Sequence, residues 1–399
     1  MATIAITWEL GSDRGHISRL CTLARALYNQ QHKVILIVSD HSLVESLLSN
    51  QDQTRIKVIR LPNDSPPPAT YSRDPCNFSE VLLTSGYYDT KYLTLQFSLW
   101  NNLYKKIKPD LVVFDYSPAA LFVARSWGFK KIVIGAGFTV PPLVSPYPSY
   151  HPSQNISGDN LAQSDLRLLK TINTALESVN LTALDSLNSS YENAQTFVLS
   201  NPIIDPYAEH RTNEVYLGSV RTEPATGKEI CWQSSIGTPK IIGYLKPHFE
   251  NLKLLLNALV DLNAEANIFV PGIPPDIGKM VSGTKIKISD TPYRLKEAFV
   301  DADYFLCHGG NSYTLECLQK GIPGILIPLQ MEQSLTALRI AQLKLGAAIN
   351  PYDKNLYSHI GQLLSTQKYK TNANGLKNKK LTIKIEDLCN EIINHLDSG

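Results

Sequence analysis

Two kinds of hydrophobic pattern alternate from the start of the chain. Thr3 to Thr7 and Val34 to Val38 are short apolar runs rich in β-branched residues, and the second is apolar enough to be a strand buried on both faces. Between them, residues 17–28 place apolar side chains on one face at helical spacing. A strand, a helix and a further strand in this order predict a βαβ unit.

The same alternation returns after residue 110. We predict strands at 111–114 and 131–134 with a helix at 118–127 between them, so a parallel sheet covers the first half of the chain. Residues 62–75 contain three consecutive prolines, which excludes regular structure and predicts a surface loop.

The pattern breaks once and then resumes. Residues 221–238, with two glycines and a proline, are predicted to be a linker. The strands expected after it are 240–244, 267–270, 285–288, 304–307 and 324–327. The chain closes with an amphipathic helix at 381–396.

This organisation predicts an α/β protein with two Rossmann-like, doubly wound domains facing a cleft. Its parts are an N-terminal domain at 1–220, a linker at 221–238, a second domain at 239–380 and a C-terminal helix at 381–399 that packs back on the first domain. Because ligands bind beyond the carboxyl ends of parallel strands, functional residues are expected in the loops that follow strands.

Composition narrows the class of protein. The 399 residues hold 38 Lys and Arg against 36 Asp and Glu, which lacks the basic excess expected for a nucleic-acid partner. The six cysteines are scattered, without metal-ligand spacing, and are expected to be reduced thiols. The N-terminus does not read as a secretory signal and no apolar run is long enough to span a membrane, so we expect a cytoplasmic protein, with contact to a membrane surface left open.

The loop after the first strand carries a candidate base. Only Gly11 and Gly15 are present there, so the dinucleotide fingerprint is incomplete. His16 falls at a helix N-terminus, whose dipole favours the neutral imidazole that a general base requires. Asp115 ends a strand expected at the same sheet edge and could orient that ring. The plainer interpretations are a histidine that packs the helix start and an aspartate that caps the next helix.

A second motif follows the strand at 304–307. Two glycines turn the chain into a helix, and its first backbone N–H groups suit a diphosphate. The candidate binding residues of this motif are His308, Gly309, Gly310, Asn311, Ser312, Thr314 and Glu316. Glu332 and Gln333 begin a later helix and could bind sugar hydroxyls, although polar residues at helix starts are common.

These residues resemble a known family. The runs HGGNSYTLE at 308–316, GIPGILIPL at 321–329 and EQ at 332–333 are similar to the donor-site signature of bacterial UDP-dependent glycosyltransferases of the two-Rossmann GT-B fold, in family one and related to the MurG-like enzymes. The GHISRLCTLARAL run at 15–27 resembles the start of their acceptor domain.

The resemblance implies a role for each matched position. His16 corresponds to the catalytic base and Asp115 to its acidic partner. The diphosphate contacts are His308, Gly310, Asn311 and Thr314, with Glu316 on the ribose and Glu332 with Gln333 on the donor sugar; Gly15, Gly309 and Ser312 join the binding set. Lys246 stands where the family has a Ser- or Gly-rich loop, and it could supply a charge to the phosphate or be an ordinary exposed lysine. The resemblance implies an inverting, metal-independent transfer from a nucleotide sugar, with no resident cofactor.

Departures from the family pattern leave open which nucleobase and which sugar the donor carries. Glu332 replaces the usual aspartate, Thr336 replaces an asparagine, and no tryptophan stands within 289–293. Asp301 and Asp303 spell a metal-binding D-x-D but lie before a strand and away from the phosphate loop, so we interpret them as unrelated to metal.

Acceptor binding and rival functions are the least constrained. An apolar acceptor pocket could be lined by Phe138, Thr139, Tyr87 and Trp100, although aromatic residues are more often core. The alternatives are a nucleotide-sugar epimerase on the same fold, or a non-catalytic nucleotide-sugar-binding or activator subunit.

Overall fold

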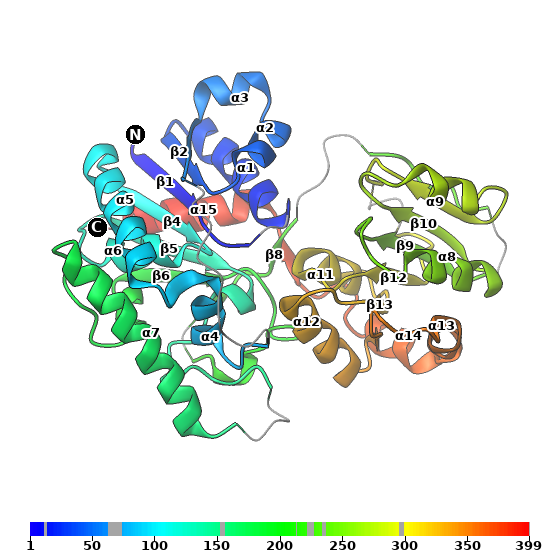
Figure 1. The fold of residues 1–399 in the computed structure, drawn as a ribbon. Helices are drawn as coiled ribbons and strands as arrows, with labels where there is room; N and C mark the ends of the chain where they lie inside the picture. Colours follow the sequence, from blue (N-terminus) through cyan, green and yellow to red (C-terminus); the bar gives the residue numbers. More distant parts are fainter. Residues whose placement is uncertain are drawn as a thin grey trace. The chain divides into compact units, whose positions relative to one another are not determined.

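A computed structural model describes residues 1–11, 14–62, 74–151, 156–212, 214–221, 227–233, 237–294 and 299–398. Most of the proline-rich loop predicted at 62–75, and parts of the linker predicted at 221–238, lie outside these residues. The chain divides into two compact units (Figure 1). Unit 1 comprises Met1–Leu199, Tyr207–Val220 and Ile383–Gly399, and unit 2 comprises Ser200–Pro206 and Arg221–Thr382.

Unit 1 is built on a parallel sheet in the order β3-β2-β1-β4-β5-β6-β7. Its strands are β1 (Thr3–Trp8), β2 (Lys33–Val38), β3 (Lys57–Arg60), β4 (Leu111–Asp115), β5 (Lys130–Gly135), β6 (Ala194–Val198) and β7 (Val215–Tyr216). Its α-helices are α1 (Arg14–Asn29), α2 (His41–Leu47), α3 (Asn50–Arg55), α4 (Phe78–Leu82), α5 (Thr90–Ile107), α6 (Pro118–Ala124), α7 (Gly158–Ser178) and α15 (Ile385–Asp397). Shorter helical turns are η1 (Leu83–Tyr87), η2 (Gly137–Thr139), η3 (Leu187–Tyr191) and η4 (Ala208–His210).

Helices cover both faces of this sheet. Every residue of β4 is buried, and its side chains alternate between two hydrophobic clusters. One cluster packs α5, α6 and α7 against the sheet, and the other packs α1 and α15. Burial on both faces is why the strands of this sheet are continuously apolar rather than alternating.

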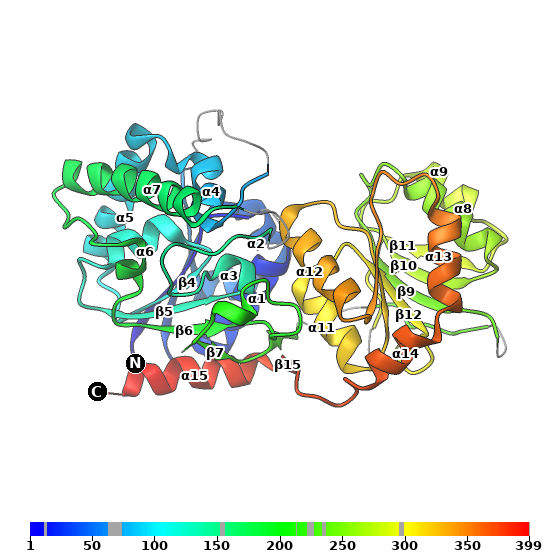
Figure 2. The same cartoon turned by 90° about the horizontal axis from the view of Figure 1, so that it is seen from below.

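The C-terminal helix packs within unit 1, beside α1 (Figure 2). Leu388, Cys389 and Ile392 are fully buried there. The helix starts later than predicted, because Thr382–Ile383 form strand β15, which pairs with β8 (Ser219–Val220). The Lys130 ammonium donates to the carbonyl of His395 at 2.9 Å, which places a cation at the negative end of the helix dipole.

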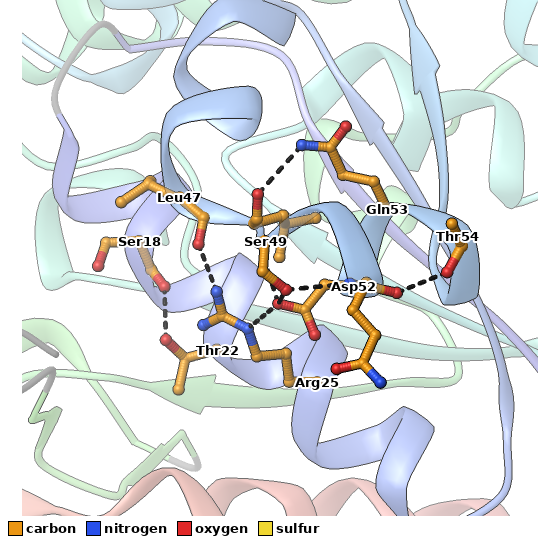
Figure 3. A network of polar contacts seen from close by, with 10 residues as sticks. Ser18, Thr22, Arg25, Leu47, Ser49, Asp52, Gln53 and Thr54 are labelled. Atoms are coloured by element: carbon orange, nitrogen blue, oxygen red, sulfur yellow. Dashed lines mark hydrogen bonds and ion pairs between the residues drawn. The ribbon is translucent and has the colours of Figure 1, made fainter.

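A polar network fastens α3 to α1 (Figure 3). Arg25 on α1 donates from Nε to Asp52 Oδ2 at 2.9 Å and also contacts the carbonyl of Leu47. Asp52 accepts from the backbone and hydroxyl of Ser49, which completes a capping box at the start of α3. The ion pair is partly exposed, with 36% of the Arg25 side chain and 20% of the Asp52 side chain accessible.

Unit 2 repeats the arrangement with a parallel sheet in the order β11-β10-β9-β12-β13-β14. Its strands are β9 (Lys240–Tyr244), β10 (Glu265–Phe269), β11 (Ile286–Ser289), β12 (Tyr304–Cys307), β13 (Gly324–Leu326) and β14 (Gly346–Ala348). Its helices are α8 (Leu252–Asp261), α9 (Pro275–Met280), α11 (Asn311–Gln319), α12 (Met331–Gln342), α13 (Leu356–Ser365) and α14 (Gln367–Asn374). The first six strands of unit 1 and the strands of unit 2 both follow the doubly wound 3-2-1-4-5-6 order, which confirms the predicted fold class.

Two segments differ from the predicted division. Residues 200–206 were expected in the first domain but belong to unit 2, because Ile204 is buried in a hydrophobic cluster of that unit. Residues 227–233, expected in the linker, also pack on unit 2: Ile230 is buried and Gln233 N–H donates to Glu265 at 2.7 Å. Proline and glycine content could not reveal either contact.

Candidate functional site

His16 and Asp115 meet at the carboxyl edge of the sheet in unit 1. His16 lies in the first turn of α1, Asp115 ends β4, and Nδ1 of the ring is 2.8 Å from the carboxylate oxygen Oδ1. Asp115 is fully buried, whereas the His16 side chain is 13% exposed. The structure therefore joins two residues that are 99 positions apart in the sequence.

Arg19, one turn after His16 on α1, completes this cluster and was missed by the sequence analysis. Its Nε donates to Asp115 Oδ2 at 3.2 Å and its Nη2 contacts the same oxygen. The i, i+3 spacing from His16 on a helix was the available signal. Burial alone would raise the pKa of Asp115, but the charges and hydrogen bonds of Arg19 and His16 outweigh it and lower the pKa to about 2.

The ionised Asp115 sets the tautomer of His16. A carboxylate only accepts hydrogen bonds, so Nδ1 of the ring carries the hydrogen that it shares with Asp115. Nε2 is then the ring atom with a lone pair that can take a proton.

Two aromatic rings flank His16. The Trp8 ring centroid lies 6.2 Å from that of His16, and the Tyr116 centroid lies 6.1 Å away, both nearly parallel to the imidazole. Trp8 ends β1 in register with Asp115, and Tyr116 follows Asp115 directly. The backbone of Tyr116 is left-handed, with φ of 46°, which is unfavourable for a bulky side chain.

Beside Tyr116, unit 1 contains an apolar cavity. Its walls are Phe78, Leu82, Phe114, Tyr116, Ser117, Pro118, Leu121, Phe122, Val133, Thr139, Tyr147, Leu168, Leu187, Ser190 and Tyr191. The Ser117 hydroxyl is buried and makes no hydrogen bond to any residue that the structure describes. The walls of this cavity are therefore mostly apolar, with one buried hydroxyl that no described residue satisfies.

Of the four predicted acceptor residues, Thr139 lines this cavity. Tyr87, Trp100 and Phe138 are not among its walls. Trp100 is fully buried in the core between α5 and the sheet, and Phe138 stacks on Tyr150. Their apolar character reflects core packing, which sequence alone could not distinguish from a pocket.

In unit 2, the glycine turn lies between β12 and α11. Gly309 has φ of 95°, and a side chain there would meet the backbone oxygen of Gln333 at 2.8 Å. Gly310 is the N-cap of α11 and offers no side-chain cap to the first-turn amides. The first-turn N–H groups of a helix have no carbonyl of their own helix to bind, so they can receive an anion.

Three of the residues predicted to bind the nucleotide sugar are buried and form hydrogen bonds within the protein. His308 bridges two loops, with Nδ1 2.7 Å from the carbonyl of Ile327 and Nε2 accepting from the Lys246 N–H at 2.9 Å. Gln333 accepts the Leu329 N–H at 2.9 Å, and the Thr314 hydroxyl lies 3.8 Å from the Cys307 sulfur. These side chains shape the loops around the glycine turn.

The other predicted donor residues are more accessible. Lys246, Asn311, Ser312, Glu316 and Glu332 are half-buried. The amide oxygen of Asn311 accepts from the Ser200 hydroxyl at 2.6 Å, both within unit 2. Gly15, in the first turn of α1 in unit 1, is exposed.

Asp303 has a structural role. One carboxylate oxygen accepts the Lys240 N–H at 3.0 Å and the other pairs with the Lys370 ammonium at 2.6 Å. Among the described residues, no cluster of three histidine, cysteine or acidic side chains could hold a metal ion. All six cysteines are free thiols. No helix in the described ranges is both long and apolar enough to span a bilayer.

The buried pair predicts unequal costs for two aspartate substitutions. Asp115→Asn leaves the Arg19 charge buried without its counterion and should lower the free energy of unfolding by about 3 to 5 kcal/mol at pH 7. Asp52→Asn, which breaks the more exposed pair with Arg25, should cost about 1 kcal/mol or less. Urea unfolding of both variants measures the difference.

The pH dependence follows from the lowered pKa of Asp115. A carboxylate with a folded-state pKa of about 2 stabilises the fold above its ordinary pKa of 3.8, and that contribution disappears as the pH falls toward 2. The gap between wild type and Asp115→Asn should therefore narrow below pH 4. A difference in the free energy of unfolding between wild type and Asp115→Asn that is equal at pH 7 and pH 3 would contradict the lowered pKa of Asp115.

The two glycines of the turn should differ when each is replaced by alanine. Gly309→Ala should destabilise unit 2 by about 2 kcal/mol or more, since the new methyl group is strained by the positive φ and meets backbone. Gly310→Ala is the matched control, because nothing lies within 4 Å of its added carbon. Thermal unfolding should separate the two variants, and equal midpoints would show that the turn does not require Gly309.

Comparison with known proteins agrees with this architecture. Residues 275–388 match the model of the glycosyltransferase family 28 C-terminal domain. The chain is 23% identical over 267 residues to the NDP-glycosyltransferase YjiC of Bacillus licheniformis, and the match covers 63% of this chain and 62% of the relative.

Solved structures share the fold along the whole chain. The glycotransferase of kitacinnamycin aligns with a TM-score of 0.69 at 17% identity, covering 99% of both chains. The glycosyltransferase VinC in complex with DTDP aligns with a TM-score of 0.62 at 14% identity, covering all of both chains. The chain therefore has the fold of the GT-B glycosyltransferases, and its residues 275–388 are similar to the glycosyltransferase family 28 C-terminal domain.

Proposed function

We propose that this protein is an inverting, metal-independent glycosyltransferase that moves a sugar from a pyrimidine nucleoside diphosphate sugar to an acceptor hydroxyl. The observation that carries the proposal is the cluster of His16, Asp115 and Arg19, in which the buried carboxylate binds Nδ1 of the imidazole and leaves Nε2 as the nitrogen that could take a proton. The match of residues 275–388 to a glycosyltransferase domain supports the donor half of the proposal.

In the proposed reaction His16 is the general base. Its Nε2 takes the proton of the acceptor hydroxyl, whose oxygen attacks the anomeric carbon of the donor. The bond from that carbon to the nucleoside diphosphate breaks, and the diphosphate leaves with the bonding electrons. Asp115 stabilises the imidazolium that results, as a buried carboxylate does in other base and acid pairs.

We assign the donor to unit 2. The first turn of α11, which follows Gly310, would hold the diphosphate through its backbone amides and helix dipole. Glu316 and Glu332, both half-buried, would accept hydrogen bonds from sugar hydroxyls. The nucleotide sugar is a co-substrate, and the proposal includes no resident cofactor. VinC binds DTDP, so both uridine and thymidine donors are candidates.

We assign the acceptor to the apolar cavity of unit 1. Tyr116 is a wall of that cavity and also stacks beside His16, so this one ring connects the cavity to the proposed base. Ser117 would bind a polar group of the acceptor. The proposed acceptor is therefore an apolar alcohol or phenol.

Removing the base should abolish most transfer. His16→Ala should lower kcat about a hundredfold or more, the usual contribution of a positioned base. The assay combines UDP- and dTDP-sugars with a panel of apolar phenols and alcohols, and mass spectrometry detects the glycoside. His41→Ala, which removes a partly exposed histidine of α2, is the control.

Three outcomes would overturn the proposal. Near-normal transfer by His16→Ala would contradict the assignment of His16 as the general base. A changed nucleotide sugar without any acceptor would favour an epimerase. Nucleotide-sugar binding without turnover of any acceptor would favour a binding subunit.

Donor binding can be tested separately by thermal shift. A nucleotide that binds only the folded protein raises its melting temperature, so UDP or dTDP should stabilise the chain while inorganic phosphate should have a smaller effect. Glu316→Ala should weaken donor binding by about 1.5 to 3 kcal/mol, the contribution of a hydrogen bond to a charged group. Glu391→Ala, on the exposed face of α15, should leave it unchanged. Equal affinities for the two variants would exclude Glu316 from the donor site.

A further inference from the structure

Glu9 is a buried carboxyl group to which the proposed mechanism gives no role. It follows β1 directly, and its side chain reaches the start of α6. Oε1 accepts the Ala120 N–H at 2.7 Å, and Oε2 accepts the Ala119 N–H at 2.9 Å. The Tyr87 hydroxyl on η1 donates to Oε2 at 3.2 Å. Three donors from two segments therefore converge on one side chain.

The backbone around Glu9 binds the same turn from the other side. The N–H groups of Glu9 and Leu10 point to the carbonyl of Tyr116, at 3.4 and 3.1 Å. The turn at residues 115–120 runs from the last residue of β4 into the first residues of α6. It is thus held at Tyr116 by the main chain and at Ala119 and Ala120 by the carboxyl group.

This turn needs such support because Tyr116 is left-handed. A bulky residue with φ of 46° costs free energy, and such a conformation persists where the surrounding contacts over-determine it. Without the clamp from Glu9, Tyr116 would relax toward ordinary backbone angles. Asp115 and Ser117, its two neighbours in the chain, would turn with it.

The same three residues carry the proposed acceptor site. Asp115 fixes the tautomer of His16, the Tyr116 ring stacks beside the imidazole, and the Ser117 hydroxyl faces the apolar cavity. A rotation of the turn would move all three groups together.

We propose that Glu9 is a positioning residue, which holds the turn at residues 115–120 so that Asp115 and Tyr116 keep the His16 imidazole in its productive orientation. This inference rests on the proposed function, in which His16 is the base. Glu9 itself touches no reacting atom and acts through the turn.

The charge state of Glu9 links this role to pH. Burial raises the pKa of Glu9 to about 7, against the hydrogen bonds from Ala120, Ala119 and Tyr87, which lower it. The phenols that face it, Tyr87 and Tyr104, have pKa values raised well above 10 by burial, so they stay neutral. Glu9 is thus the group of this cluster that changes charge near neutral pH. The ionised form is the better acceptor for its three donors.

The test replaces Glu9 by glutamine. The amide of Glu9→Gln has one accepting oxygen, so its NH2 group must face a backbone N–H, that of Ala120 in one orientation or that of Ala119 in the other. The matched control is Asp110→Asn: Asp110 accepts the Thr3 N–H at 2.6 Å, at the opposite edge of the same two strands. Both variants lose a carboxylate that binds backbone, but only Glu9→Gln changes the contacts of the turn at residues 115–120.

Glu9→Gln should lower kcat at least tenfold at pH 8 while the KM for the donor stays unchanged, and Asp110→Asn should not. Below pH 7 wild-type Glu9 is protonated and neutral, so the ratio of wild-type to variant kcat should shrink toward pH 6. In nitrogen-15 NMR, the His16 ring signal from the Nδ1–H that Asp115 accepts should shift in Glu9→Gln and stay in place in Asp110→Asn.

The NMR measurement needs no turnover, so it decides the inference even if the proposed reaction is wrong. An unchanged His16 signal in Glu9→Gln, or a loss of thermal stability with normal kcat and normal pH dependence, would overturn it. If Glu9→Gln does not fold, Tyr87→Phe removes one donor with little change in volume and should shift the same signal and lower kcat severalfold. A Tyr87→Phe variant identical to wild type in both measurements would also overturn it.

Discussion

The carboxylate of Asp115 is the interaction on which the candidate site in unit 1 depends. It is buried completely, so its charge is tolerable only because Arg19 and His16 bind it from α1. The same contact joins the end of β4 to the first turns of α1 and selects the imidazole tautomer. The ion pair with Arg19 and the orientation of the His16 ring therefore depend on the same carboxylate.

In unit 2, the conformation of the glycine turn is fixed by close packing rather than by an ion pair. Gly309 packs against the backbone of Gln333, while His308 is bonded through both ring nitrogens to neighbouring loops. The loop is thus shaped by packing and hydrogen bonds before any ligand arrives. Such preorganisation suits a site that receives charge through backbone amides, because the donors need not move to bind it.

Part of the site could be predicted from the residues alone. His16 and Asp115 were expected to meet because each follows a strand of one parallel sheet, and the register of β1 with β4 brings those ends together. Arg19 escaped notice, since an arginine on an amphipathic helix usually faces solvent. Trp100 was considered for a pocket although it belongs to the core, because the sequence pattern marks a side chain as apolar but does not say which surface covers it.

The doubly wound fold class was determined by the sequence itself, because periodicity and loop chemistry are local properties of the chain, although the patterns did not predict strands such as β3 and β6 or helices such as α5 and α7. The tertiary structure alone decided which polar groups became partners. Glu9 lies 110 and 111 positions from the amides it accepts, and residues 200–206 join unit 2 through Ile204. Contacts of this length depend on how the sheets and helices pack, and no local pattern encodes them.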